Sequence, residues 1–233
     1  MARCLLADGE CGRLDRRCPS DSCIARTVRR LHERRWRDKL GLFFVEGEDA
    51  VEAATAEPVE LLVAGEDVAP ELLAEVSTAA HPPRVIGVYR RADLPAADSR
   101  PVTLALWGVA DPGNLGTLLR TADAFGAAVA LGPDCADPTS PKALRASAGS
   151  IWRVPLVEAG SGTRVALEAH GGRPLGELDL AGDVVFLLGA EREGLPAGVP
   201  RDVEATIALA GAESLNVAAA GAIALYEWRR QNP

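Results

Sequence analysis

Three short blocks in the second half of the chain place polar side chains where an apolar run gives way to a turn. The first, DPGNLGTLLR, carries Asn114 and, six residues later, Arg120. The second, LLGAEREGL, carries Glu191, and the third, ALAGAESLNV, carries Ser214 and Asn216. Amide, guanidinium, carboxylate and hydroxyl groups at one site can orient a polar substrate and stabilise a developing negative charge.

Each block also has a purely structural interpretation. Gly113 and Gly116 flank the beginning of a helix, whose free N–H groups suit an anion, but Asn114 at that point could simply be the helix N-cap. Ser214 is likewise a good N-cap for the last helix. Glu191 could be an exposed turn residue. The residue types alone leave these alternatives open.

The elements around the blocks alternate between apolar strands and helices, which predicts an open parallel sheet with helices on both faces. In such sheets, ligands bind at the carboxyl ends of the strands, where the three blocks lie. The predicted strands are 102–109, 127–132, 153–157, 183–189 and 205–209. The predicted helices are 115–126, 141–148, 165–170 and 214–230. Many small residues in the last helix suit either tight internal packing or a face between subunits.

The first half of the chain predicts a separate small α/β domain. A basic amphipathic helix is expected first, followed by alternating strands and helices, with a turn at Gly47. The expected elements are a helix over 24–40, a strand and helix within 41–56, strands over 59–65 and 84–89, and a helix over 69–80. The expected organisation is a disordered leader (1–21), a first domain (22–92), a linker (93–101) and a second domain (102–233).

Composition and charge narrow the class of protein. The chain is 48% hydrophobic and 25% charged, as in globular domains, and has neither a secretory signal nor an apolar run that could span a membrane, so we expect a cytoplasmic protein. Its net charge of −8 is unevenly spread, because 13–39 holds ten basic residues and four acidic ones. Such a basic segment on an acidic body suits a phosphate-bearing partner, although a solvated basic helix is the plainer alternative.

The sequence lacks the residue patterns of several other classes of site. Neither a dinucleotide-binding G-x-G-x-x-G nor a P-loop occurs in the second half. The three histidines lie far from the blocks, which disfavours a Ser-His-Asp hydrolase. Four early cysteines lack the paired spacing of a structural zinc site, so we expect no metal; they are Cys4, Cys11, Cys18 and Cys23. Cys135 stands alone and is expected to be structural.

Taken together, the blocks resemble a known family. N-x-G-x-x-x-R (114–120), G-A-E-x-x-G-L (189–195) and E-S-L-N-V (213–217) resemble the three ordered motifs of the SpoU (TrmH-like) RNA 2′-O-ribose methyltransferases, of the SPOUT class. The intervening 140–157 is also similar, and 29–54 looks like that family's N-terminal substrate-binding domain, which is similar to ribosomal protein L30e. Three motifs in order are far more specific than any one of them.

The resemblance implies an S-adenosylmethionine-dependent enzyme that methylates a ribose 2′-hydroxyl in ribosomal or transfer RNA, with a C-terminal trefoil knot and a homodimer. The implied catalytic residues are Arg120, Asn114, Glu191, Ser214 and Asn216. The implied cofactor-binding residues are Leu188, Gly189, Ala190, Glu191, Ile207, Leu209, Ser214 and Leu215. The expected RNA-binding residues are Arg29, Arg30, Arg34, Arg35, Arg37 and Arg120. Neither DNA nor a membrane is expected as a partner.

The family's arginine is often assigned as the base, but a guanidinium keeps its proton, so we expect Arg120 to bind a phosphate and stabilise the alkoxide.

Two departures from the family pattern are notable. Ala208 replaces a usual proline, and the span 170–183 is short and glycine-rich, which puts an edge strand in doubt. The alternatives are a non-catalytic RNA-binding protein that keeps the fold, a base methyltransferase, and a small-molecule enzyme of the Rossmann type.

Overall fold

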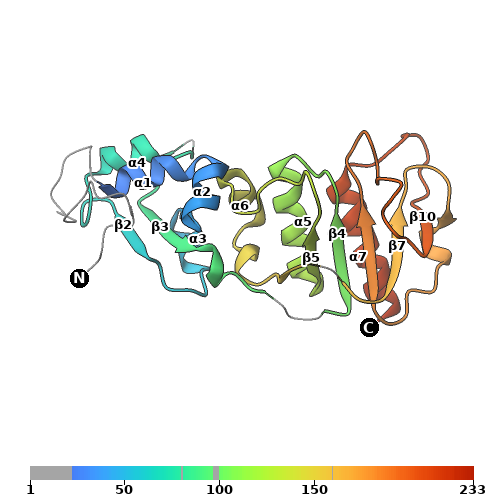
Figure 1. Ribbon diagram of the computed structural model, residues 1–233. Helices are drawn as coiled ribbons and strands as arrows, with labels where there is room; N and C mark the ends of the chain where they lie inside the picture. Colours follow the sequence, from blue (N-terminus) through green and yellow to red (C-terminus); the bar gives the residue numbers. More distant parts are fainter. Residues whose placement is uncertain (1–22, 80, 97–99, 159) are drawn as a thin grey trace. The chain divides into compact units, whose positions relative to one another are not determined.

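The computed structural model describes residues 23–79, 81–96, 100–158 and 160–233. The chain divides into two compact units (Figure 1). The first contains the described residues up to Asp93 together with Thr139–Pro141, and the second contains the rest. The predicted leader 1–21, with three of the early cysteines, lies outside the described residues, and Cys23 is the first residue of helix α1.

The described part of the first unit combines an antiparallel sheet with short helices. In the order in which they pair, its strands are β1 (Leu42–Glu46), β3 (Val85–Arg90) and β2 (Glu60–Val63). Its helices are α1 (Cys23–Leu31), α2 (Arg34–Leu40), α3 (Glu48–Glu52) and α4 (Pro70–Val76), followed by the 3-10 turn η1 (Arg91–Asp93). Val28 and Leu31 of α1 are fully buried and pack with Leu73, Phe44 and Ile86 in one core.

The helix predicted over 24–40 is wrong in one respect, because it is broken into α1 and α2. Arg37 explains the break: its side chain is buried, and its guanidinium donates to the carbonyl oxygens of Leu31 and His32 at 2.7 and 2.8 Å. These carbonyls lack helical partners where α1 ends, and Arg37 satisfies them.

The second unit contains a seven-stranded sheet in which every observed pair is parallel, as predicted. In spatial order the strands are β6 (Leu156–Val157), β5 (Ala128–Leu131), β4 (Val102–Leu106), β9 (Val184–Leu188), β7 (Thr163–Leu167), β10 (Val203–Thr206) and β8 (Arg173–Pro174). The doubtful edge strand exists, but only as the two residues of β8. Because the strands run in one direction, their carboxyl ends meet at one edge.

The helix predicted over 165–170 is wrong. Residues Thr163–Leu167 form β7, which pairs with β9 on one side and β10 on the other. Val165 and Ala166 are fully buried, so packing between neighbouring strands overrides the local preference of this short apolar segment.

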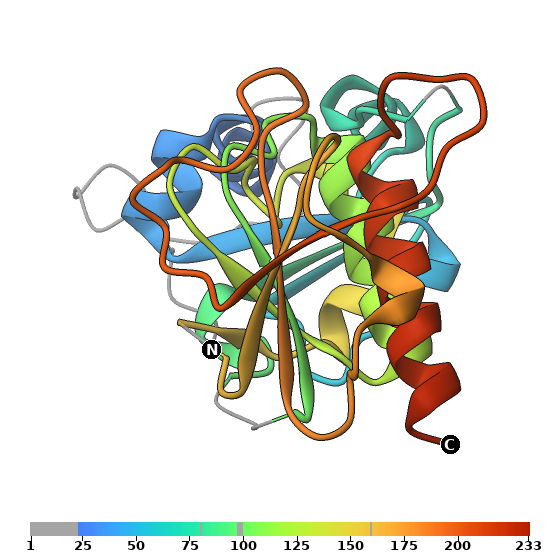
Figure 2. The same ribbon diagram turned by 90° about the vertical axis from the view of Figure 1, so that its right-hand side faces the viewer.

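Helices α5 (Pro112–Phe125) and α7 (Val217–Gln231) pack side by side on one face of this sheet (Figure 2). A Cβ on Gly221 would lie 2.5 Å from the Leu118 side chain, so the small residues of α7 permit this close approach. Gly116 of α5 similarly faces α6 (Pro141–Ser147), where a Cβ would lie 2.4 Å from the carbonyl oxygen of Ala143. Both glycines therefore serve helix packing.

The opposite face of the sheet differs from the prediction of helices on both sides. Its described hydrophobic cluster joins small strand residues such as Ala105 and Ala166 to Leu195 and Val199 of the loop after β9, and includes no helix residue. Cys135, which we expected to be structural, is buried in the loop after β5. Its Sγ lies 3.4 Å from the carbonyl oxygen of Leu106.

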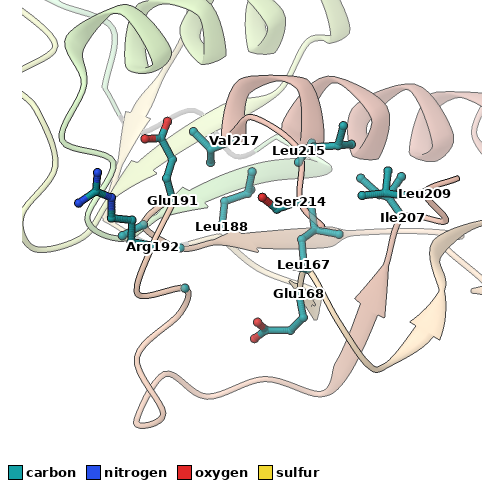
Figure 3. Close-up of a pocket in the computed structure, with 15 residues that line it drawn as sticks. Leu167, Glu168, Leu188, Glu191, Arg192, Ile207, Leu209, Ser214, Leu215 and Val217 are labelled. Atoms are coloured by element: carbon teal, nitrogen blue, oxygen red, sulfur yellow. The ribbon is translucent and has the colours of Figure 1, made fainter. Parts of the chain in front are cut away.

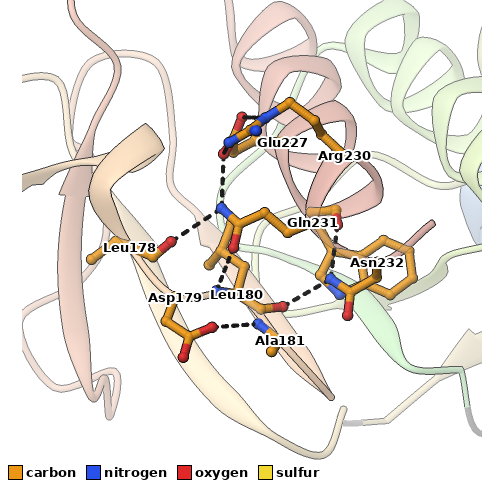
Figure 4. Close-up of polar contacts among 9 residues, drawn as sticks. Leu178, Asp179, Leu180, Ala181, Glu227, Arg230, Gln231 and Asn232 are labelled. Atoms are coloured by element: carbon orange, nitrogen blue, oxygen red, sulfur yellow. Dashed lines mark hydrogen bonds and ion pairs between the residues drawn. The ribbon is translucent and has the colours of Figure 1, made fainter.

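The C-terminal end of α7 is tied to the segment that precedes β9 (Figure 4). Gln231 accepts a hydrogen bond from the backbone N–H of Leu180 at 2.9 Å and donates to the carbonyl oxygen of Leu178 at 3.1 Å. Asn232 donates to the carbonyl oxygen of Leu180 at 3.0 Å, and the Trp228 indole donates to that of Gly182 at 3.2 Å. These bonds fix the direction of α7, whose other end contributes to the site.

Candidate active site at the carboxyl edge of the parallel sheet

A pocket lies at the carboxyl ends of β7, β9 and β10 (Figure 3). Apolar side chains cover most of its wall, and two carboxylates and one guanidinium stand among them. Its lining residues are Leu167, Glu168, Ala169, Leu188, Gly189, Ala190, Glu191, Arg192, Gly194, Ile207, Leu209, Ser214, Leu215, Val217 and Ala220. All eight residues that the sequence suggested for cofactor binding are among them.

A tight loop after β9 positions Glu191. Ala190 and Gly194 exchange backbone hydrogen bonds at 2.9 and 3.2 Å, which folds the loop back on itself. A Cβ on Gly189 would lie 2.1 Å from the carbonyl carbon of Gly194, so only glycine permits this approach. The loop therefore holds Glu191 at the exposed margin of the pocket.

Asn114, Glu191 and Asn216 form a hydrogen-bonded chain that joins all three sequence blocks. The Asn114 Nδ2 donates to the Glu191 carboxylate, and the Asn114 Oδ1 accepts from Asn216 Nδ2 at 3.0 Å. Glu191 and Asn216 lie 77 and 102 residues from Asn114 along the chain. The fold thus brings together three of the five predicted catalytic residues in direct contact.

The helix caps are not the residues that we considered. Asp111, rather than Asn114, caps α5, because its carboxylate accepts from the backbone N–H groups of Gly113 and Asn114 at 2.8 and 3.0 Å. Asn216, rather than Ser214, caps α7 by accepting from the N–H groups of its first turn. Ser214 instead lines the pocket.

The carboxylate of Asp111 also forms an ion pair with Lys142 at 2.7 Å. The hydrogen bond from Lys142, followed by those from the backbone, lowers the pKa of Asp111 below its usual value. Because this carboxylate already occupies the first turn of α5, the helix terminus is not free to bind another anion.

Arg120 does not line this pocket. It is exposed on α5, and within the described residues it forms no hydrogen bond or ion pair. A guanidinium in this state can bind an external anion without first giving up an internal partner.

The basic residues predicted to bind RNA in the first unit differ in their surroundings. Arg29, Arg34 and Arg35 form ion pairs with Glu75, Asp38 and Glu33, and Arg37 is buried as described above. Arg30 stacks over Trp36, with its Cζ 4.6 Å from the ring centroid. The Lys39 Nζ and the Arg35 Cζ lie 5.2 and 5.8 Å from the same centroid. Arg37 is therefore withdrawn as an RNA-binding residue, and Lys39 is a candidate that the sequence did not single out.

Two further charged residues of the pocket escaped prediction. Glu168 directly follows β7. Because the sequence predicted a helix over 165–170, Glu168 was not expected at the carboxyl end of a strand. Arg192 lies next to Glu191 and is exposed at the same margin. Arg192 lies in the second sequence block beside Glu191. The motif G-A-E-x-x-G-L leaves its position unspecified, so the pattern gave no reason to select it.

Residues 101–226 match the family model of the SpoU rRNA methylase family. The chain belongs to this family. It is 34% identical to RlmP of Bacillus subtilis, a 23S rRNA (guanosine(2553)-2′-O)-methyltransferase, over 86% of this chain and 94% of that protein.

Solved structures of two AdoMet-bound methyltransferases share the fold. AviRb from Streptomyces viridochromogenes, in complex with the cofactor AdoMet, is 27% identical with a TM-score of 0.79, covering 90% of this chain and 97% of that one. An AdoMet-bound rRNA methyltransferase from Sinorhizobium meliloti is 29% identical with a TM-score of 0.78, covering 89% and 94%.

The described residues lack the features of two other classes of protein. No helix there is both long and apolar enough to cross a membrane. The same part of the chain contains no group of three or more His, Cys, Asp or Glu side chains arranged to hold a metal ion.

Proposed function

We propose that this protein methylates a ribose 2′-hydroxyl in ribosomal or transfer RNA, with S-adenosylmethionine as its cofactor. The observation that carries the proposal is the hydrogen-bonded chain of Asn114, Glu191 and Asn216 at the margin of a pocket at the strand ends. The family membership and the named relatives agree with this chemistry.

The residues of the pocket fit the cofactor. Ile207, Leu209 and Leu215 offer an apolar wall for an adenine ring, while Glu168 and Glu191 offer acceptors for hydroxyl or ammonium donors. The bound cofactor supplies an electrophilic methyl group on a sulfonium. Leu188, Gly189, Ala190 and Ser214 complete the set of residues that we assign to binding it.

The catalytic residues have separate roles in the proposal. A hydroxyl attacks efficiently only as its proton leaves, and the Glu191 carboxylate is an acceptor-only group, so we assign the proton to it. Asn114 and Asn216 hold Glu191 in place, and Ser214 orients the ligand. Arg120 binds the phosphate next to the reacting ribose and stabilises the negative charge that develops on its oxygen.

We also propose that the protein is a homodimer that packs through α7. Ala219, Ile223 and Tyr226 are exposed on one face of this helix, and the last two side chains are 38% and 60% accessible. An apolar stripe on an otherwise polar surface suits a second copy. Because Arg120 does not line the pocket of its own chain, we assign it to the partner's site.

The domain assignments remain part of the proposal. We propose that the first unit is the L30e-like RNA-binding domain (22–92), joined by a linker (93–101) to a methyltransferase domain (102–233) whose C-terminal part is knotted. The structural relatives cover both units, which supports this division.

We further propose that the protein is cytoplasmic. We also propose that it does not act on DNA, since deoxyribose lacks the accepting hydroxyl.

A transfer assay tests the function. The full chain is incubated with methyl-labelled S-adenosylmethionine and separate pools of transfer and ribosomal RNA, and the digested nucleosides are identified. We expect label on a ribose 2′-oxygen. Label on a base would contradict the proposal, and binding of both cofactor and RNA without any label would favour the non-catalytic alternative.

A further inference from the structure

We infer that Glu168, held in place by Arg201, binds the ribose hydroxyls of the cofactor's adenosyl group. This inference rests on the proposed function, since it assigns one further residue to recognition of the same cofactor. None of the three sequence blocks contains Glu168, which lies at the end of a different strand.

The backbone fixes Glu168 at the wall of the pocket. It directly follows β7, and its N–H donates to the carbonyl oxygen of Ala205 in β10 at 2.9 Å. This bond continues the ladder between the two strands, so Glu168 cannot move away without breaking it. Figure 3 shows its side chain leaving the end of β7, below Ser214.

Arg201 fixes the carboxylate itself. Its Nη1 donates to Glu168 Oε1 at 2.7 Å, while its other groups donate to the carbonyl oxygens of Pro196 and Val199 at 2.9 and 3.3 Å. The Arg201 and Glu168 side chains are only 18% and 25% exposed. A guanidinium anchored at several points restricts the carboxylate to one orientation, which reduces the entropy lost when a ligand binds.

One oxygen of Glu168 remains available to a ligand. Within the described residues, Oε2 accepts no hydrogen bond, and it lies 3.9 Å from the position that a Cβ on Gly194 would occupy. Gly194 itself lines the pocket. An ionised carboxylate only accepts hydrogen bonds, so the group that it recognises must be a donor.

The arrangement along the pocket selects the ribose as that donor. Ile207 and Leu209 lie at one end in Figure 3, Glu191 and Arg192 lie at the other, and Glu168 stands between them. An apolar end, a central acceptor and a charged end match the order of adenine, ribose and amino acid in the cofactor. Carboxylates beyond strand ends bind ribose hydroxyls in dinucleotide sites by the same chemistry.

Calorimetric binding of S-adenosylhomocysteine tests the inference without any turnover. Four titrations combine wild type and Glu168→Gln with this ligand and with its 2′,3′-dideoxy analogue. We expect each single change to weaken binding about tenfold or more, because it removes a hydrogen bond to a charged group. The two changes together should weaken it no further than one alone, since they remove the same interaction.

Glu204→Gln is the matched control, because Glu204 also contacts Arg201, at 3.4 Å, but does not line the pocket. It should bind both ligands as wild type does. The inference would be overturned if the dideoxy ligand weakened binding to Glu168→Gln by the same factor as it weakens binding to wild type. It would also be overturned if wild type bound the two ligands with equal affinity. The wild-type comparison requires no variant, so it decides even if Glu168→Gln fails to fold. Failure of wild type to bind S-adenosylhomocysteine would instead overturn the proposed function.

Discussion

Asn216 performs two tasks with the two ends of one amide. Its Oδ1 accepts from the first turn of α7, while its Nδ2 donates to Asn114. The first task concerns the stability of a helix and the second concerns the site, so a substitution that separates them reveals how much each contributes.

Asn216→Asp should separate the two tasks, because aspartate caps helices as well as asparagine does but cannot donate to Asn114. We expect a melting temperature close to that of wild type and a kcat at least about tenfold lower. Asn216→Ala should lose the cap too, at about 0.5–2 kcal/mol. Equal kcat values for wild type and Asn216→Asp would show that the hydrogen bond to Asn114 has no catalytic effect.

Arg120→Ala should lower kcat by about 10²–10³ because it removes a group that stabilises developing charge. The Kd for S-adenosylhomocysteine should change less than about twofold, since we assign Arg120 to the RNA phosphate and not to the cofactor. Arg120→Lys keeps the charge but loses the planar fork, and should recover only part of the rate. Steady-state kinetics with calorimetry test this; unchanged turnover in Arg120→Ala would remove the role that we assign.

At the scale of elements, Asp111 joins the beginning of α5 to Lys142 of α6. Its folded pKa is lowered, so its contribution to stability is fully present above the pKa of the unfolded chain, about 3.9, and is lost as the pH falls through the lower folded value. The acid limb of a stability curve therefore reports on this cap.

Asp111→Ala should destabilise the protein by about 0.5–2 kcal/mol at neutral pH, the usual effect of losing a cap. Part of the difference from wild type should vanish at the acid end of the curve, where Asp111 is protonated in wild type too. Asp111→Asn keeps a capping oxygen and should lose less. Urea unfolding at several pH values measures this, and a difference that does not shrink towards low pH would contradict it.

The sequence allowed most strands of the second unit to be predicted, because uninterrupted apolar runs such as Val184–Leu188 carry a clear pattern. β7 was missed since its five residues fit a helix equally well, and only its neighbours decide. The break at Leu31 was missed because it depends on Arg37 turning back, which no periodicity encodes. The eight pocket residues that the motifs suggested were found, whereas Arg192 was overlooked within a motif and Glu168 depended on the missed strand.

At the scale of the whole molecule, the exposed stripe on α7 and the position of Arg120 both point to a paired arrangement. In a symmetric dimer with shared sites, one copy completes the pocket of the other. Mixing two impaired variants distinguishes this arrangement from two self-sufficient subunits.

Co-expressed Arg120→Ala and Asn216→Asp chains should recover about a quarter of wild-type activity, because half of randomly paired dimers are mixed and each holds one intact site. Each variant alone is the control. Absence of recovery in purified mixed dimers would assign Arg120 to its own chain, and a monomeric wild-type protein would overturn the dimer itself.

RNA binding should depend on the cations around Trp36. Replacing Arg30 and Lys39 by alanine should weaken RNA binding, and it should reduce the slope of log K against log salt by about 0.7–0.9 for each phosphate that the variant no longer binds. The matched control, Arg34→Ala, removes a residue paired with Asp38 and should have a smaller effect. An unchanged slope in the double variant would place the RNA elsewhere.

The bond between Asn114 and Asn216 also governs when the site can exist during synthesis. The two residues are 102 positions apart along the chain. The ribosome must therefore add all the residues between Asn114 and Asn216 before the two amides can meet. A prematurely terminated chain that lacks α7 would retain all seven strands of the sheet but have no complete site, and contacts of such long range favour slow folding.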